Sequence, residues 1–119
     1  MDLIQLNLSI RDKIKEIEEH RKAFRNVIEK KANNNALYDK NLAIAILKLR
    51  NGVSFEIEGQ KIVNPPVSIT EKIAKGICWK DKLEVERADA EYKALFTSID
   101  TLKTEINGLQ SIIKHMDEI

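Results

Sequence analysis

The sequence has few of the residues that mark disulfide-rich, metal-binding or membrane-spanning proteins. It contains one cysteine, Cys78, and two histidines, His20 and His115, among 119 residues. A lone cysteine excludes an intramolecular disulfide, and three such residues are too few for a structural zinc site. No apolar run approaches the roughly 20 residues of a membrane span, and no basic region precedes Leu3 as in a signal peptide. We therefore expect one cytoplasmic domain, residues 1–119, without metal, cofactor or membrane contact.

A catalytic arrangement is also missing from the sequence. The paired carboxylates Glu18–Glu19 fall on a helix face that we expect to be solvated, and neither histidine has a nucleophile at a suitable spacing. The four glycines do not form a phosphate-binding loop. Cys78 follows Ile77 and is expected to be a small core residue, although Lys80 would lower the pKa of an exposed thiol. We therefore expect the protein not to be an enzyme.

Charge and helical periodicity are abundant, since 33% of the residues are charged. From Val85 onward, apolar residues alternate at spacings of three and four, which is typical of the a/d seam of a coiled coil. After Ala88 the seam positions are Tyr92, Leu95, Ile99, Leu102, Ile106, Leu109, Ile113 and Met116. The sequence therefore predicts a long helix over residues 81–117.

The N-terminal half predicts two further helices. Apolar residues recur at helical spacing over residues 1–31, although Arg21 interrupts their stripe. They are Leu3, Leu6, Ile10, Ile14, Ile17, Phe24 and Ile28. An alternation over the first ten residues leaves a strand there as an alternative. Residues 33–35 are three asparagines, which favour a break. A second helix over 36–51 has an apolar run, residues 42–47, that suggests burial on every face, and Asn51–Gly52 would end it.

The middle of the chain changes period. Residues 53–63 alternate apolar and polar side chains around Glu58–Gly59, which predicts a β-hairpin with Phe55 opposite Ile62. After two prolines, Ser68 and Glu71 have the spacing of a capping box, which predicts a helix over 68–80. The fold class is therefore mainly α: an elongated antiparallel helical hairpin or coiled coil with a small head containing a β-hairpin.

The predicted head is basic, because residues 40–82 contain eight basic and four acidic side chains. Trp79 lies among lysines, a combination that can stack on an unpaired base while the cations hold phosphates. The candidate nucleic-acid-binding residues are Lys48, Arg50, Lys61, Lys72, Lys75, Trp79, Lys80 and Lys82. The alternative is that Trp79 anchors the core of the head while the lysines keep its surface solvated.

The heptad seam also has two interpretations. It either closes only against the chain's own first helix or is shared between subunits as well. A stalk of only two helices leaves apolar side chains exposed on its sides, which favours a homo-oligomer.

A resemblance rests on three segments of the sequence: residues 43–52, the segment from Ser68 to Ile73, and Glu91–Tyr92. Over residues 36–116 their order resembles small tailed-phage proteins of the recombination and replication module, and is similar in layout to recombination mediators of the UvsY family. The resemblance implies a non-enzymatic, oligomeric accessory protein that binds single-stranded DNA and contacts a recombinase or single-strand-binding protein in the host cytoplasm. Lys48 and Arg50 would carry that role.

Two alternative functions remain open at this point. One is a protein-binding inhibitor or counter-defence factor that acts on a host enzyme and needs no DNA. The other is a helical chaperone of the prefoldin kind, which the order of helix, hairpin and helix suggests.

Overall fold

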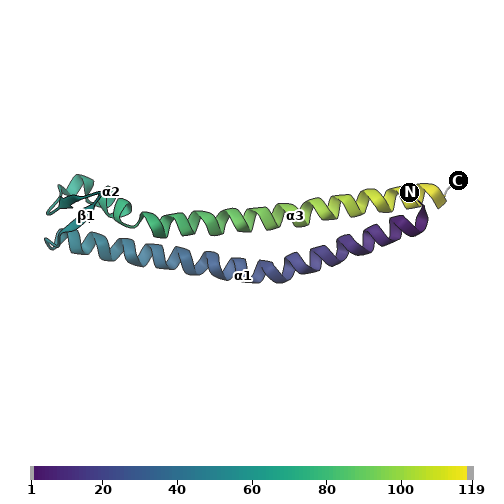
Figure 1. Ribbon diagram of the computed structural model, residues 1–119, viewed down its shortest axis with the longest axis horizontal. Helices are drawn as coiled ribbons and strands as arrows, with labels where there is room; N and C mark the ends of the chain where they lie inside the picture. The colour runs from purple at the N-terminus through teal and green to yellow at the C-terminus, as the bar shows by residue number, and fades with distance from the viewer. Residues whose placement is uncertain (1, 118–119) are drawn as a thin grey trace. The chain divides into compact units, whose positions relative to one another are not determined.

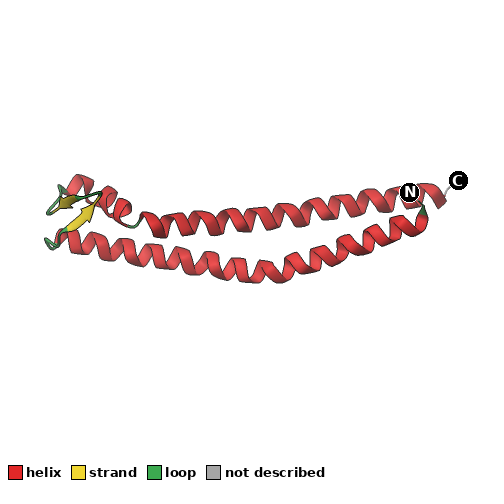
Figure 2. Ribbon diagram, in the orientation of Figure 1, coloured by secondary structure: helices red, strands yellow, loops and turns green. Residues whose placement is uncertain are grey.

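The computed structural model describes residues 2–117 and is mainly helical (Figure 1). Its elements in chain order are α1 (Leu3–Arg50), β1 (Phe55–Ile57), β2 (Gln60–Ile62), α2 (Val67–Ile77) and α3 (Trp79–Asp117). The chain divides into two compact units: a first unit, Met1–Ile28 with Ala90–Ile119, and a second unit, Glu29–Asp89. Both strands, yellow in Figure 2, belong to the second unit. The predicted fold class, a helical hairpin with a small β-hairpin, is confirmed.

In the first unit, the N-terminal part of α1 and the C-terminal part of α3 lie side by side and antiparallel (Figure 1). The predicted seam of α3 faces this interface, with Leu102 only 7% exposed and its seam neighbours half-buried. Met116, the last predicted seam residue, is exposed. The rings of Phe24 and Tyr92 pack with their centroids 5.0 Å apart. The heptad pattern therefore predicted the inner face of α3 correctly over most of its length.

The inner face of α1 differs from the prediction. Leu3, Ile14 and Ile28, which were assigned to its apolar stripe, are exposed. The positions that face α3 continue from Leu6 at spacings of four and three and include polar side chains. In the first unit they are Leu6, Ile10, Lys13, Ile17, His20, Phe24 and Val27. Arg21 does not interrupt the seam, because His20 occupies the seam position at that turn and bonds to Ser98.

The predicted break at residues 33–35 is wrong, because α1 is one continuous helix of 48 residues. Lys31 forms an ion pair with Asp89 at 3.0 Å, and the Asn34 side-chain amide donates to the carbonyl of Glu84 at 3.4 Å. Contacts with α3 thus hold the asparagine segment helical and outweigh its low intrinsic propensity.

The start of α1 is set by a reciprocal capping box. The backbone N–H of Gln5 donates to Asp2 Oδ1 at 2.8 Å, and the N–H of Asp2 donates to Gln5 Oε1 at 3.0 Å. Both bonds satisfy N–H groups that a helix start leaves without a partner. The alternative of a strand over the first ten residues is therefore wrong.

The core of the second unit is small. Ala45, Leu49, Ala74 and Cys78 are buried together, and half-buried apolar residues of α1, α2 and the hairpin pack around them. The prediction that residues 42–47 are enclosed on every face is wrong, since Leu47 is 58% exposed. The core covers only one side of α1, so the opposite side of the apolar run faces solvent. Cys78, by contrast, is a core residue as predicted.

The β-hairpin has the predicted register, with Phe55 opposite Ile62 and Glu56 opposite Lys61. Glu58 and Gly59 both have positive φ, of 50° and 75°, as a two-residue type I′ turn requires. Each strand has only three residues, so the ends of the predicted 53–63 hairpin lie outside the sheet. The predicted end of α1 is also confirmed, because Gly52 has a φ of 81° just past the last helical turn.

Helix α2 begins earlier than predicted and without the expected capping box. Its N-cap is Pro66, with no side-chain cap, and Ser68 lies inside the first turn. The carbonyl of Pro66 instead accepts from the backbone of Ile69 and the hydroxyl of Thr70, both at 3.0 Å. The helix ends at Ile77 and α3 begins at Trp79, so Cys78 separates them rather than residues 80 and 81. Across residues 2–117, no helix has an apolar stretch long enough to cross a membrane.

Candidate functional site

The eight residues predicted to bind nucleic acid are all exposed and all belong to the second unit. They come from four elements. Lys48 and Arg50 end α1, Lys61 is on β2, Lys72 and Lys75 are on α2, and Trp79, Lys80 and Lys82 begin α3. Of the seven cations, only Lys80 makes a described contact with Trp79, its Nζ atom lying 5.6 Å from the ring centroid.

Trp79 is 56% exposed, so the alternative that it anchors the core is wrong. It borders a hollow of about 160 Å³ that Ile57, Gly76 and Ile77 also line. Two carboxylate residues of the hairpin, Glu56 and Glu58, line the same hollow. The surface beside Trp79 is therefore partly acidic, which charge counting along the sequence did not indicate, because the hairpin carries these residues to α3.

Two of the predicted cations have carboxylate partners on their own helix. Lys75 lies 3.5 Å from Glu71, and Lys82 lies 3.0 Å from Glu86. The hydrogen bond to Glu86 raises the pKa of Lys82, and the attraction of that carboxylate adds to the effect. Exposed pairs of this kind are weak and can exchange for other anions. Within the described residues the other five cations have no ion pair. They are Lys48, Arg50, Lys61, Lys72 and Lys80.

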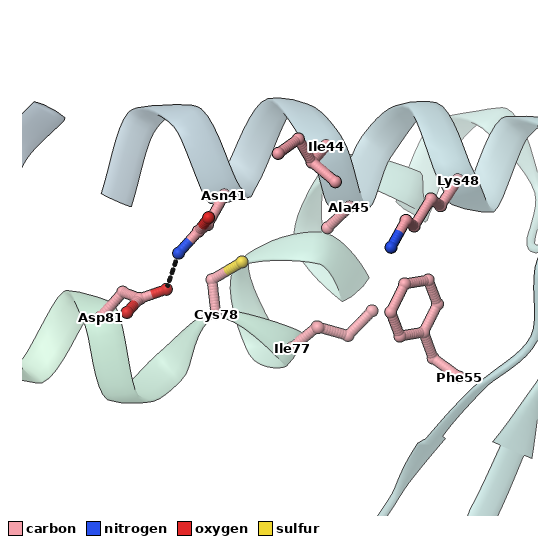
Figure 3. Close-up of a pocket in the computed structure, with 8 residues that line it drawn as sticks. All are labelled: Asn41, Ile44, Ala45, Lys48, Phe55, Ile77, Cys78 and Asp81. Atoms are coloured by element: carbon pink, nitrogen blue, oxygen red, sulfur yellow. Dashed lines mark hydrogen bonds between the residues drawn. The ribbon is translucent and has the colours of Figure 1, made fainter. Parts of the chain in front are cut away.

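A second hollow, of about 240 Å³, lies where α1, β1 and the junction of α2 and α3 meet (Figure 3). Asn41 lines one end and donates its side-chain amide to Asp81 Oδ2 at 2.9 Å. Lys48 lines the hollow with its ammonium beside the ring of Phe55, as Figure 3 shows. Cys78 also lines it, and desolvation, followed by the charge of Asp81, raises the pKa of its thiol.

Of the residues lining this second hollow, only Lys48 was singled out as a binding residue from the sequence. The others come from segments far apart in the chain. The one sequence signal for the site is the pair of small residues, Ala45 and Cys78, at positions where larger apolar side chains would fill the space.

Two surfaces of the first unit were also missed. Arg21, Lys22 and Arg25 line a hollow of about 370 Å³ on α1, and none of the three has an ion pair within residues 2–117. Near the chain ends, a hollow of about 340 Å³ includes Lys13 and Glu105 in its lining. These two residues form an ion pair, and their hydrogen bond raises the pKa of Lys13.

Comparisons with known proteins add no family. No family model, curated protein or solved structure matches the chain. Within the part of the chain that the structure describes, no group of three or more His, Cys, Asp or Glu side chains could hold a metal ion.

Proposed function

We propose that the protein is a non-enzymatic binding module whose second unit binds a partner protein through the hollow beside Trp79. The observation that carries this proposal is the exposed indole flanked by the two hairpin carboxylate residues. Tryptophan is among the residues most enriched at the energetic centres of protein interfaces. A basic side chain of the partner would lie against the indole and pair with a carboxylate.

Single-stranded DNA is the second candidate ligand, and one observation favours it. Lys80 stands over the ring of Trp79, and four others of the predicted binding cations have no ion pair among the described residues. A base stacked on Trp79 would bring its phosphate toward Lys80. Glu56 and Glu58 oppose this arrangement because they line the same hollow and repel phosphate. The proposed partner of the first candidate is therefore basic rather than anionic.

The two candidates predict effects of opposite sign for one pair of substitutions. The experiment measures fluorescence anisotropy of two labelled probes, an oligo-dT strand and a peptide of alternating arginine and alanine, across a salt series. We expect Glu56→Gln combined with Glu58→Gln to weaken peptide binding by about tenfold, because a charge-assisted contact is lost. The same variant would strengthen oligo-dT binding if phosphates lie beside these carboxylates.

A matched control variant removes the same number of negative charges as the hairpin variant. Glu18→Gln combined with Glu19→Gln removes two exposed carboxylates from α1, in the first unit, and is expected to leave peptide binding nearly unchanged. Trp79→Ala is expected to weaken binding of the probe that uses the hollow. Peptide binding that is unaffected by Trp79→Ala and by the hairpin variant would refute the proposal. Oligo-dT binding that rises in the hairpin variant would replace it with the DNA function.

The identity of the partner remains a prediction. A recombination or replication protein follows from the sequence resemblance to tailed-phage accessory proteins, and a host enzyme is the alternative. The predicted homo-oligomer is likewise a proposal, supported by seam residues such as Ile99 and Ile106 that a single partner helix leaves half-buried. Light scattering of the full chain tests it, and a mass equal to one chain at micromolar concentration would contradict it.

A further inference from the structure

The second hollow combines an apolar middle with opposite charges at its two ends. Asp81 lies at one end beside Asn41, and Lys48 lies at the other end beside Phe55 (Figure 3). Asn41 and Lys48 are seven residues apart on α1, which corresponds to roughly 10 Å along the helix axis. Within the described residues Lys48 has no ion pair, and Asp81 has Asn41, a neutral donor, as its side-chain partner. The ammonium group of Lys48 and the carboxylate of Asp81 therefore do not pair with each other.

The middle of the hollow is built from small and apolar side chains. Ala45 and Cys78 are 4% and 6% exposed and form its inner wall, while Ile77 and Phe55 flank it. Larger residues at positions 45 and 78 would fill this space. The space of about 240 Å³ is enough for an aliphatic chain, and the apolar walls favour one over water.

We propose that this hollow binds a linear zwitterion, in which an aliphatic chain separates an ammonium group from a carboxylate. The ammonium pairs with Asp81, the carboxylate pairs with Lys48, and the methylenes lie over Ala45 and Cys78. A spacer of roughly five methylenes matches the distance between the two ends of the hollow. A simple carboxylate would leave Asp81 unpaired beside its chain, and a simple amine would leave Lys48 unpaired. The charge pattern therefore selects a ligand with both groups.

This ligand chemistry has two sources. One is a free ω-amino acid, and the other is the C-terminal lysine of a peptide, whose side-chain ammonium and terminal carboxylate have a similar separation. The free acid and the peptide place the same groups at Asp81 and Lys48. Amidation of the peptide C-terminus removes the carboxylate and so distinguishes recognition of the terminus from general attraction of a lysine side chain.

The test is a nuclear magnetic resonance titration of the full chain with 6-aminohexanoate, hexanoate and hexylamine, following the backbone amides of Ala45, Phe55 and Cys78. We expect saturable shifts with 6-aminohexanoate and affinities at least about tenfold weaker for the other two compounds, since each lacks one charge-assisted contact. A short peptide ending in lysine is expected to bind, and its amidated form is not. Binding of 6-aminohexanoate without binding of the peptide would assign the site to free amino acids.

Two variants test the roles of the charged ends. Lys48→Met and Asp81→Asn are each expected to weaken 6-aminohexanoate binding by about tenfold, and Asp81→Asn keeps a side chain that Asn41 can still contact. Lys40→Met is the matched control, because Lys40 is an exposed residue of the same helix outside the hollow. Equal binding of hexanoate, unchanged affinity in both variants, or equal weakening by Lys40→Met would overturn the proposal, as would shifts that do not saturate.

This inference does not depend on the proposed function. Trp79 lines a different hollow of the second unit and does not line this one. Trp79→Ala is therefore expected to leave 6-aminohexanoate binding unchanged while weakening the arginine peptide. Failure of one experiment leaves the other interpretable, because each site has its own probe and its own variants.

Discussion

The burial pattern of α1 predicts very different costs for two leucines that lie two positions apart. Leu49 is 1% exposed and packs in the core with Ala74 and Cys78, whereas Leu47 is 58% exposed. Leu49→Ala removes buried carbon atoms and leaves a cavity that the neighbouring helix fills only in part. Such substitutions cost about 3–5 kcal/mol at fully buried sites. Leu47→Ala loses less than half of a leucine's burial, about 1 kcal/mol, and gains slightly in helix propensity.

The assay is urea unfolding followed by the helical circular dichroism signal of the full chain. With a slope of about 1–3 kcal/mol per molar urea, Leu49→Ala is expected to lower the midpoint by about 1 M or more. Leu47→Ala is expected to lower it by a small fraction of that shift. Equal losses in the two variants would refute the reasoning, because they would mean that residues 42–47 are covered on every side. Repeating both at several protein concentrations would show whether a second copy supplies that cover.

Two further predictions concern backbone conformation and pH. Gly59 has a φ of 75° and no atom near its missing Cβ, so Gly59→Ala is expected to cost about 1–2 kcal/mol of unfolding free energy through backbone strain alone, measured by urea. Gly108 is helical and also has open space, so Gly108→Ala is expected to stabilise by about 0.5–1 kcal/mol. The pKa of Cys78 is raised above its ordinary value of 9.0, so the fold favours the protonated thiol and loses this stability as pH rises through the raised value. Relative to Cys78→Ala, the native chain is expected to lose unfolding free energy as the pH rises above 9.0, and equal pH profiles would contradict this.

Local patterns predicted the parts of the fold that depend on neighbouring residues. The β-hairpin register followed from alternation around Glu58–Gly59, and the end of α1 followed from Gly52, because each requires a backbone conformation that few residues adopt. The inner face of α3 followed from an uninterrupted apolar heptad. The capping box at Ser68 failed because Pro66 is already the N-cap of α2, two residues before the position that the sequence pattern suggested.

The candidate sites were less predictable because they depend on contacts between distant segments. The exposure of Trp79 and the nearby Glu56 and Glu58 result from packing of the hairpin against α2, which no periodicity in the sequence encodes. The charged ends of the second hollow, Lys48 and Asp81, are separated by the whole hairpin and α2 in sequence. Only the antiparallel pairing of α1 with α3 brings them to one hollow.

The polar residues that obscured the periodicity of α1 are also the ones that specify its register against α3. Each has a polar partner within its own unit: Lys13 with Glu105, His20 with Ser98, Lys31 with Asp89, Asn34 with the Glu84 carbonyl, and Asn41 with Asp81. A purely apolar heptad seam would pair nearly as well after a slip of seven residues. In the first unit such a slip would place Lys13 opposite Ser98 and Glu105 opposite Leu6, so the ion pair between Lys13 and Glu105 would be lost and Glu105 would face an apolar side chain. In residues 2–117 no buried side-chain nitrogen or oxygen lacks a hydrogen-bond partner, so the observed register is the one that satisfies the polar interruptions on both helices.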